Sequence, residues 1–384
     1  MSATTPVTQY LDTADSVDKF LAGLNGVRSL ALDTEGASFH RFVDRIYLLQ
    51  LSTDRHEAII DPLPIGKPSR LGALLEDPVV EVVLHDADYD LRLLHQDYGW
   101  RITHLFDTRV AAQLLGIRSF GLAALLERYF DIHLDKKHQR ADWSMRPLTP
   151  GMLDYAAQDT RYLLALRDRL REELEASGRW QWAEEEFHRS EGAHWEPEQP
   201  DSGFLRVKGA RDLSRRELAR LRELVQWRDS LAAELDRATF RVTGNDVLLA
   251  MARSAPGSRD AVSAVKGFPR GMPEASVRDV LAAVERGNEI PEAELPRFPR
   301  APRWDRDPDF DVKVAALKAV RDKVAGDLDL DPGLLCSRER LEAIVRRKPR
   351  EADDLLEVPG MRKWQAELLG QGFLASLASA GGGR

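Results

Sequence analysis

Strand-like runs are crowded into residues 28–61 of this 384-residue chain. SLALDTE alternates apolar and polar positions, IYLLQLST is rich in apolar residues, and EAIID ends at Asp61. A fourth run, VEVVLH, covers residues 80–85, and helical patterns follow it: DYDLRLLHQDYG, DTRVAAQLLG, GLAALLERYF and LDYAAQDTRYLLALRDRLREELE. Hairpin-like strands followed by alternating strands and helices predict an α/β domain built on a mixed sheet.

The C-terminal half reads as helices and contains two copies of one pattern. WRDSLAAELDRATFRVTGNDVLLAM can be laid over VRDKVAGDLDLDPGLLCSRERLEAI without a gap. The constant offset of 93 residues pairs Arg228 with Arg321 and Gly267 with Gly360. Such an offset predicts a duplicated module, against the alternative of chance similarity between two helical segments.

Two polar segments that contain several prolines mark the expected boundaries between domains. We expect an α/β domain, a linker, a helical domain, a second, proline-rich linker and a second helical domain, over residues 1–190, 191–204, 205–289, 290–310 and 311–378.

Composition excludes several classes of protein. Cys336 is the only cysteine, which rules out an intrachain disulfide and fits a reducing cytoplasm. No apolar run approaches the ~18 residues of a membrane span, and the start lacks the basic and apolar parts of a secretory signal. The net charge of −8 argues against a surface coated with nucleic acid, although residues 205–286 carry 16 Lys and Arg against 11 Asp and Glu.

Two acidic residues lie at the end of the run SLALDTE. Asp33 and Glu35 are two positions apart, so both carboxylates lie on one face of a strand. Buried acids need a partner or a cation, and oxygen-only ligands suit Mg²⁺ or Mn²⁺ better than zinc. Taken by itself this pair is weak evidence, because most such pairs are solvated strand ends.

A second acidic cluster follows the run VEVVLH. Asp86 and Asp88 suit the cap and first turn of the next helix, whereas Asp90 lies beside the apolar stripe of that helix. The local pattern favours capping for all three, and by itself leaves the choice of a metal ligand among them open.

The third cluster is DYAAQD, at residues 154–159. Tyr155 and Asp159 are four positions apart on one helical face, so both side chains can point into one site. Alone, the pair reads more simply as an aromatic at the edge of the core and an exposed charge, and Asp154 as a first-turn acid. Together the three clusters supply four carboxylates and a hydroxyl, which is what a two-metal phosphoryl-transfer site requires.

The order of these clusters resembles a known family. LDTE, LHDADYDLRLL and YAAQDTRYLL resemble the three exonuclease motifs of the DEDD superfamily, in the subclass with a tyrosine four residues before the last aspartate. DKKHQRADWSMRPLT, at residues 135–149, resembles a segment of the ribonuclease D family, with Ala141 where serine is usual. The two helical copies resemble HRDC domains. The resemblance covers nearly the whole chain.

This resemblance implies a ribonuclease H-like exonuclease domain with two divalent metal ions, Mg²⁺ or Mn²⁺. It implies that Asp33 bridges both ions, that Glu35 and Asp159 bind one, that Asp90 holds the other, and that Tyr155 positions the attacking water. The family spacing from His85 is what selects Asp90 among the three acids.

The same resemblance implies which residues lie near the substrate. They are Thr34, through its backbone, and His85, Gln139, Trp143 and Arg146. The implied reaction is hydrolysis of RNA from the 3′ end to nucleoside 5′-monophosphates, in tRNA 3′ maturation or structured RNA processing. Apart from the resemblance, the single cysteine and the lack of apolar spans predict a cytoplasmic protein without a membrane partner, and nothing in the sequence requires more than a monomer.

The helical domains are expected to help in holding nucleic acid. Their arginines, such as Arg215, Arg216, Arg220 and Arg222, could follow phosphates, although a solvated helix face with ion pairs is the simpler interpretation of any one of them. Three alternatives stay open: a DNA-directed exonuclease with the same site, a non-catalytic nucleic-acid-binding protein, and a phosphohydrolase built on His85 and Asp86. The last would need further metal-ligating histidines.

Overall fold

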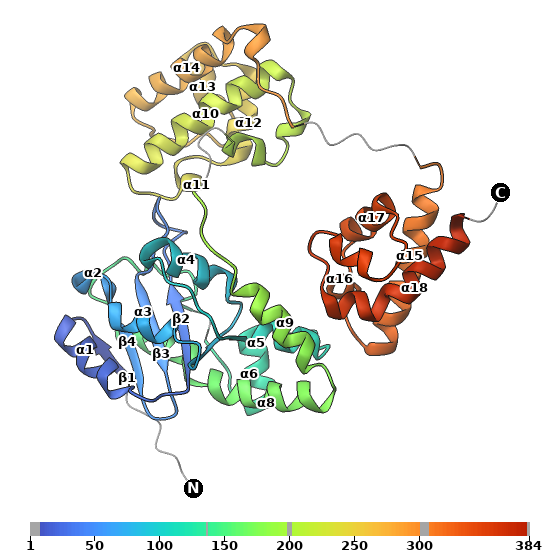
Figure 1. The fold of residues 1–384 in the computed structure, drawn as a ribbon. Helices are drawn as coiled ribbons and strands as arrows, with labels where there is room; N and C mark the ends of the chain where they lie inside the picture. The colour runs from blue at the N-terminus through green and yellow to red at the C-terminus, as the bar shows by residue number, and fades with distance from the viewer. Residues whose placement is uncertain (1–7, 136, 198–201, 300–306, 382–384) are drawn as a thin grey trace.

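The computed structural model describes residues 8–135, 137–197, 202–299 and 307–381 (Figure 1). Its first domain is built on a sheet whose strands are β1 (Thr8–Leu11), β2 (Ser29–Glu35), β3 (Leu48–Ser52), β4 (Glu57–Ile60), β5 (Glu81–Leu84) and β6 (Leu105–Asp107). The helices of this domain are α1 (Ala14–Gly23), α2 (Pro62–Ile65), α3 (Ser69–Leu75), α4 (Asp88–Tyr98), α5 (Thr108–Leu114), α6 (Leu122–Phe130), α7 (Pro150–Arg161), α8 (Leu163–Ala176) and α9 (Trp180–Ser190).

The sheet is mixed, with strand order β1-β4-β3-β2-β5-β6. β3 pairs antiparallel with both β2 and β4, and the remaining strand pairs are parallel. The central strand β2 therefore has β3 on one side and β5 on the other, and its register sets Asp33 opposite Gln50. This arrangement confirms the predicted α/β fold on a mixed sheet.

The two faces of the sheet bury different helices. Leu30 and Leu32 of β2 pack in the core that includes side chains of α1, α3 and α4. Ala31 points to the other face, where side chains of α5, α6, α8 and α9 form a second core. Because side chains alternate along a strand, Asp33 and Glu35 lie on the same face as Ala31, and this is the face on which α7 packs against β2, β3 and β4.

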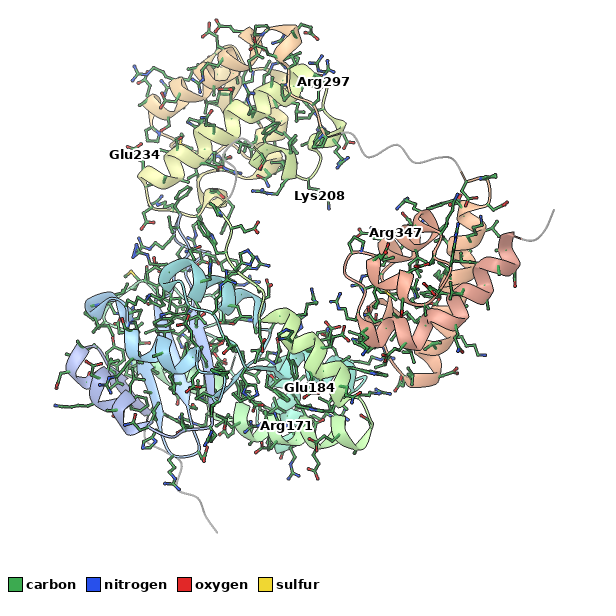
Figure 2. All side chains as sticks on the ribbon, viewed as in Figure 1. Arg171, Glu184, Lys208, Glu234, Arg297 and Arg347 are labelled. Carbon is green, nitrogen blue, oxygen red and sulfur yellow. The ribbon has the colours of Figure 1, made fainter. Side chains whose placement is uncertain are left out.

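The four strand-like runs identified in the sequence are strands in the structure, but the sequence pattern did not predict two further strands. β1 is a short edge strand, and β6 has three residues in a mostly polar context. The expected continuous helix over 153–175 is also wrong, since it is divided at Tyr162 into α7 and α8. β5 carries a buried Glu81 that ion-pairs with Arg167 and with Arg171 of α8, a residue labelled in Figure 2.

Helices alone form the two C-terminal units. The first contains the 3₁₀ helices η1 (Gly203–Arg206), η2 (Ala210–Asp212) and η3 (Glu292–Glu294) and α10 (Arg215–Glu234), α11 (Thr239–Val242), α12 (Asn245–Ser254), α13 (Arg259–Ser263) and α14 (Glu274–Glu289). The second contains α15 (Phe310–Leu328), α16 (Pro332–Leu335), α17 (Arg338–Arg347), η4 (Asp353–Glu357) and α18 (Lys363–Gly381). Parts of the two predicted linkers, 198–201 and 300–306, lie outside the described residues. No helix in the described ranges is both long enough and apolar enough to span a membrane.

The two units share details that the offset of 93 residues predicts. Arg228 and Arg321 are both buried, and each pairs with the aspartate that follows it. Gly267 and Gly360 both have positive φ, at 87° and 79°, where a side chain would be strained.

The expected phosphate-binding arginines have other partners. Arg215 and Arg216 donate to backbone carbonyls at and beyond the C-terminal end of α14, Arg220 donates to the carbonyl of Ala252, and Arg222 pairs with Glu223. These side chains hold the unit together, so their assignment to RNA is not supported.

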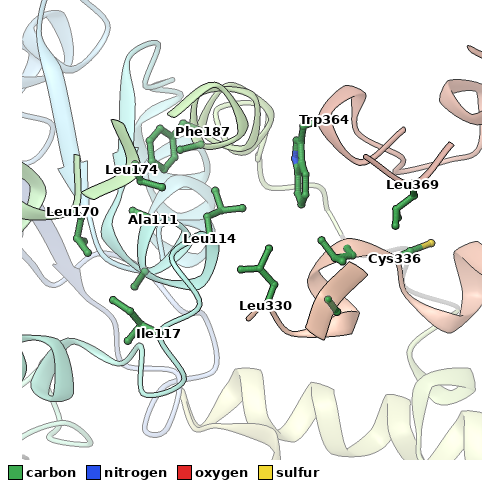
Figure 3. Close-up of a cluster of buried hydrophobic side chains, with 14 of the residues drawn as sticks. Ala111, Leu114, Ile117, Leu170, Leu174, Phe187, Leu330, Cys336, Trp364 and Leu369 are labelled. Carbon is green, nitrogen blue, oxygen red and sulfur yellow. The ribbon is translucent and has the colours of Figure 1, made fainter. Parts of the chain in front are cut away.

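The second helical unit shares a core with the first domain. Trp182 of α9 stacks on Trp364 with 4.8 Å between ring centroids, and Leu330 and Trp364 belong to the same buried cluster as Leu114 and Phe187 (Figure 3). Within this contact Arg362 and Glu186 form a buried ion pair at 2.9 Å. Glu186 also accepts a hydrogen bond from the Trp364 indole at 3.1 Å.

We expect Arg362→Ala to loosen the second helical unit by about 3 kcal/mol, because the buried carboxylate of Glu186 then keeps only the exposed Arg189, 3.5 Å away, as an ion-pair partner. The measurement is denaturation together with hydrogen exchange in α18. Lys363→Ala is the matched control: its side chain is exposed and pairs with Glu367 at 3.8 Å, so the loss stays within about 1 kcal/mol. Equal losses in the two variants would contradict the assignment.

Candidate active site

Three carboxylates meet where the end of β2 faces α7. Oxygen atoms of Asp33, Glu35 and Asp159 all lie within 4.8 Å of one another. Two of these residues come from one strand face and the third from the helix packed on it, so the contact of α7 with β2 creates the cluster.

Local contacts fix where α7 places Tyr155 and Asp159. Thr149 caps the helix by accepting from the Met152 N–H, and Pro150 occupies its first turn. Next to Asp159, the hydroxyl of Thr160 lies 2.7 Å from that of Ser52 on β3. These contacts fix the helix at both ends, and the four-residue spacing brings the tyrosine and the aspartate to one side.

Asp90 is held beside the cluster but is not part of the three-oxygen group. Its carboxylate accepts hydrogen bonds from Thr34, at 3.1 Å from the backbone N–H and 2.5 Å from the hydroxyl. The N–H of Thr34 is therefore occupied by Asp90, and the expected contact of its backbone with the terminal nucleotide stays a prediction. Thr34 fixes the metal ligand expected on α4.

The expected capping of α4 by Asp86 is wrong, whereas Asp88 does lie in the first turn of this helix. The cap position is Ala87, Asp86 has a positive φ of 65° and pairs with Arg109, and Asp88 pairs with Arg92. The N–H groups of Asp86 and Ala87 are bound by Asp107 instead, at 3.0 and 2.9 Å.

Asp107 is a residue that the sequence motifs missed. Its buried carboxylate also accepts from the N–H groups of Arg109 and Val110 at the start of α5, so one side chain fixes the beginnings of two helices. One of these helices carries Asp90. The only signal in the sequence was an aspartate before the pattern TRVAAQLL, where it reads as an ordinary helix cap.

The four acids disfavour each other's charged form. Burial, and then repulsion from the neighbouring carboxylates, raises the pKa values of Asp33 and Glu35 well above their ordinary range. Burial raises the pKa of Asp90 to about 7, and burial together with Asp90 raises that of Asp159 to about 7. Among the described residues no lysine, arginine or histidine forms an ion pair with any of them. A set of oxygen ligands that lacks cationic partners fits divalent cations such as Mg²⁺.

Tyr155 lies next to these acids and stays protonated. Burial and the negative charges of Asp159, Glu35 and Asp33 raise the pKa of its hydroxyl above the ordinary range. A hydrogen bond from this hydroxyl counteracts part of the rise in the pKa of Asp159. Tyr155 can therefore donate a hydrogen bond at the site, but it is not a base near neutral pH.

The cluster opens into a cavity of about 650 Å³. Besides the four acids and Tyr155, its lining includes His85, Tyr89, Arg109, Phe120 and Gln139. Three residues expected near the substrate, Thr34, His85 and Gln139, therefore line the cavity, whereas Trp143 and Arg146 do not.

His85 presents an acceptor nitrogen to this cavity. The hydroxyl of Thr108 donates to the carbonyl of Leu84 at 3.1 Å, so its oxygen must accept from His85 Nδ1, 2.9 Å away. Burial lowers the pKa of His85 to about 4, so the ring is neutral at pH 7. The proton is on Nδ1, and Nε2 keeps a lone pair for a hydroxyl or amide donor.

Trp143 and Arg146 support the site from behind. Trp143 is 1% exposed, and its ring centroid lies 6.0 Å from that of Tyr155. Arg146 binds Asp61 through two nitrogens, at 2.5 and 2.9 Å, and donates to the carbonyl of Trp143. The expectation that these two residues contact substrate is therefore corrected: they hold the wall on which Tyr155 rests.

Gln50 is a second residue that sequence reasoning missed. It is fully buried on β3 opposite Asp33, and its amide nitrogen lies 3.4 Å from the Glu35 carboxylate. A lone amide within the apolar run LLQLS was the available signal. Its position orients Glu35 from the neighbouring strand.

Comparisons with known proteins identify both parts of the chain. Residues 8–175 match the family model described as 3′-5′ exonuclease, and residues 217–284 and 313–377 each match the HRDC domain. Ribonuclease D of Escherichia coli K12 is 30% identical over 370 residues, which cover 94% of this chain and 96% of that protein.

Solved structures show the same likeness. The E. coli RNase D structure, described as an exoribonuclease involved in structured RNA processing, matches with a TM-score of 0.73 and 28% identity over 97% of this chain and 99% of that one. A protein from Bifidobacterium adolescentis matches with a TM-score of 0.83 and 25% identity over 96% and 97%. The two HRDC matches confirm the duplication predicted from the constant offset.

We expect Mg²⁺ or Mn²⁺ to raise the melting temperature more at pH 8 than at pH 6. Because the folded pKa values of Asp90 and Asp159 are about 7, the metal-free folded state binds protons that the unfolded state releases, and its stability falls as pH rises towards 7. A cation must displace these protons in order to bind. Below pH 7 its affinity therefore falls about tenfold per pH unit for each proton that it displaces.

Differential scanning calorimetry with and without metal checks this. Asp159→Asn should lose most of the metal-induced rise, and Asp154→Asn should keep it, because Asp154 is exposed and hydrogen-bonds to Gln158 at 2.9 Å. A metal-induced rise that is the same at the two pH values would contradict the proton competition.

Proposed function

The chain belongs to the ribonuclease D family of 3′–5′ exoribonucleases, and we propose that it cleaves the terminal phosphodiester of RNA at the cluster formed by Asp33, Glu35, Asp90 and Asp159. The observation that carries this assignment is the convergence of Asp33, Glu35 and Asp159 within 4.8 Å, on the floor of an open cavity. Hydrolysis of a phosphodiester needs stabilisation of negative charge and positioning more than it needs covalent chemistry.

Two divalent ions, Mg²⁺ or Mn²⁺, are the proposed cofactors, and when bound they activate water and stabilise the leaving oxygen. Asp33 has the central place among the ligands, since the charges of Asp90, Asp159 and Glu35 all raise its pKa. Asp33 would hold both ions, Glu35 and Asp159 would hold one of them, and Asp90 would hold the other.

Tyr155 is proposed to orient the attacking water. Its hydroxyl is protonated, hydrogen-bonds to Asp159 and is held by the rings of Trp143 and His138, both with 6.0 Å between centroids. A fixed hydroxyl of this kind donates or accepts a hydrogen bond without moving, which favours one position for the nucleophile.

His85 and Gln139 are proposed to contact the terminal nucleotide. Both line the cavity, and the neutral imidazole of His85 keeps Nε2 as an acceptor. A ribose hydroxyl is a donor that fits this nitrogen, and the 2′-hydroxyl is the group that distinguishes RNA from DNA. This chemistry favours RNA over the DNA-directed alternative.

The physiological substrate is proposed to be a structured RNA with a single-stranded 3′ end, such as a tRNA precursor. The related E. coli protein is described as acting in structured RNA processing, and the two HRDC domains supply additional surface for nucleic acid. The proposed monomer would need no second copy of the chain to complete the site, since one chain supplies the four acids and Tyr155. A cytoplasmic location is supported by the single buried Cys336, which excludes an intrachain disulfide.

We expect Asp33→Asn or Asp159→Asn to lower kcat at least about a hundredfold, because each removes a charge that holds a cation while the shape of the side chain is kept. The assay follows a 3′-tailed structured RNA with Mg²⁺, with Mn²⁺ and with EDTA, and resolves the released mononucleotides. Asp154→Asn is the matched control one residue from Tyr155, and it should retain wild-type turnover.

The same time course on a DNA strand of identical sequence tests the choice of substrate. The RNA should be degraded faster, from its 3′ end, and only with metal. Wild-type turnover by Asp159→Asn would overturn the site assignment, and faster cleavage of DNA would favour the DNA-directed alternative.

A further inference from the structure

Two exposed phenylalanines from different domains meet beside the active site. Phe39 lies in the loop between β2 and β3, and Phe240 in α11 of the first HRDC unit. Their ring centroids are 6.3 Å apart and the rings are edge to face at 76°. The side chains are 44% and 54% exposed, so this pair presents aromatic surface to solvent instead of filling a core.

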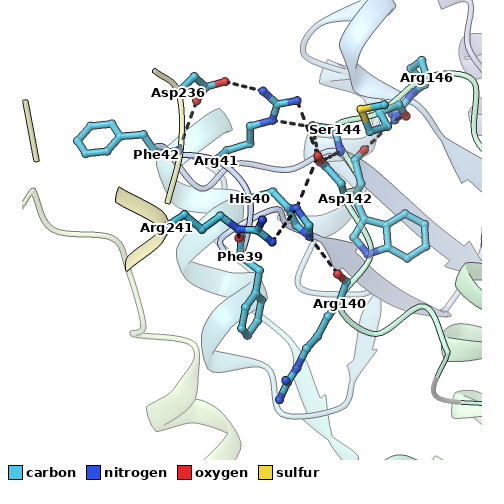
Figure 4. A network of polar contacts seen from close by, with 12 residues as sticks. Phe39, His40, Arg41, Phe42, Arg140, Asp142, Ser144, Arg146, Asp236 and Arg241 are labelled. Carbon is cyan, nitrogen blue, oxygen red and sulfur yellow. Dashed lines mark hydrogen bonds and ion pairs between the residues drawn. The ribbon is translucent and has the colours of Figure 1, made fainter. Parts of the chain in front are cut away.

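A network of polar contacts fixes this meeting of two domains (Figure 4). The Ala238 N–H donates to the His40 carbonyl at 3.3 Å, and Arg241 Nε donates to the Phe39 carbonyl at 2.5 Å. Asp236 pairs with Arg41 at 3.1 Å. The position of Phe240 relative to Phe39 is therefore set by the docking of the first HRDC unit.

Arginine side chains accompany both rings. The Arg140 guanidinium lies 5.2 Å from the Phe39 centroid, and that of Arg241 lies 6.0 Å from the Phe240 centroid. In Figure 4 the side chains of Phe39 and Arg140 extend in the same direction. Arg140 is exposed, and no ion pair is recorded for it within the described ranges. Arg241 donates to a neutral carbonyl, so both charges remain available to an anion.

His40 ties these groups together. Arg241 donates to His40 Nδ1 at 3.2 Å, so the ring proton is on Nε2, which donates to the Arg140 carbonyl at 3.1 Å. One imidazole thus connects the HRDC unit with the segment that carries Arg140.

This surface is close to the active-site cavity along the chain. Glu35 is four residues before Phe39, and Gln139, which lines the cavity, precedes Arg140. Tyr89, another residue of the lining, is 43% exposed and donates to Asp44 in the same loop as Phe39. Four residues span at most about 14 Å. With stacked nucleotides rising about 3.4 Å each, the surface begins within about four nucleotides of the scissile bond.

We propose that Phe39, Arg140, Phe240 and Arg241 form a junction platform on which bases of the single-stranded 3′ tail stack, upstream of the bond that is cleaved. Exposed aromatic rings next to unneutralised arginines are the combination that binds single strands without reading their sequence, because every base has a π-face and every nucleotide a phosphate. The platform rests on the proposed exonuclease function, and it exists only while the first HRDC unit is docked.

The test compares kcat/KM on RNA tails of different lengths with the full-length enzyme and Mg²⁺. A dinucleotide is too short to reach the platform and reports the active site alone, whereas an eight-nucleotide tail reaches it. We expect Phe39→Ala and Phe240→Ala to lower the ratio of kcat/KM on the long tail to that on the dinucleotide by about 5- to 100-fold, mainly through KM. Arg140→Gln should also lower the salt dependence of binding by about one phosphate contact.

Phe42→Ala is the matched control, because Phe42 is an exposed phenylalanine of the same loop for which no ring or guanidinium contact is recorded among the described residues. For Phe42→Ala, the ratio of kcat/KM on the long tail to that on the dinucleotide (the length ratio) should equal that of wild type. Phe39→Trp should retain the preference for the long tail.

Each outcome decides the platform. An unchanged length ratio in Phe39→Ala and Phe240→Ala would overturn it, as would an equal loss in Phe42→Ala. Self-association that disappears in Phe39→Ala, with an unchanged length ratio, would also overturn it and assign the surface to a second copy of the chain. Absence of metal-dependent hydrolysis of both RNAs by the wild-type enzyme is a different result, since it would remove the proposed function itself.

Discussion

Mutual repulsion among carboxylates crowded into one partly buried site is the constraint on which the rest of the site depends. Asp33, Glu35, Asp90 and Asp159 are brought together on three separate elements, and burial alone disfavours their charges. A cluster of this kind would spread apart unless the backbone around it were fixed. The observed supports do this: central strand pairing holds β2, the Ser52–Thr160 contact holds α7, and Asp107 holds the start of α4. Folding therefore holds the carboxylates close together before any cation binds.

Much of this arrangement could be predicted from the sequence, because the signals were local. The alternation in SLALDTE puts Asp33 and Glu35 on one face, and the helical spacing of Tyr155 and Asp159 puts them on one side. Resemblance to known motifs then joined these elements, which periodicity alone could not do. Asp90 shows the limit of local reasoning, since only the family spacing separated it from Asp86 and Asp88.

The features that were missed depend on contacts between residues distant in sequence. Asp107 reads as the cap of its own helix, and only the fold shows that it also binds the turn before α4. Trp143 and Arg146 belong to a motif that suggested substrate contact, yet their burial and internal hydrogen bonds place them behind Tyr155. A motif identifies residues that matter to a site without telling which of them touch the substrate.

The two copies of the helical unit contact the first domain through equivalent positions. Asp236 and Asp329 are 93 residues apart, both have positive φ, at 44° and 52°, and each pairs with an arginine of the first domain, Arg41 at 3.1 Å and Arg118 at 3.0 Å.

Exposed ion pairs contribute little stability, so what the two copies share is the geometry of this contact and not a large contribution to stability. In the second copy the backbone of Asp329 comes so close to Gly116 that a Cβ there would lie 2.4 Å from its carbonyl oxygen. Both docked loops border the cavity: one begins at Glu35, and the other leads to Phe120 in the lining. Each copy of the duplicated module therefore holds one of the two loops at the opening of the same site. The second copy also forms the buried ion pair of Arg362 and Glu186, which the first copy lacks within the described residues.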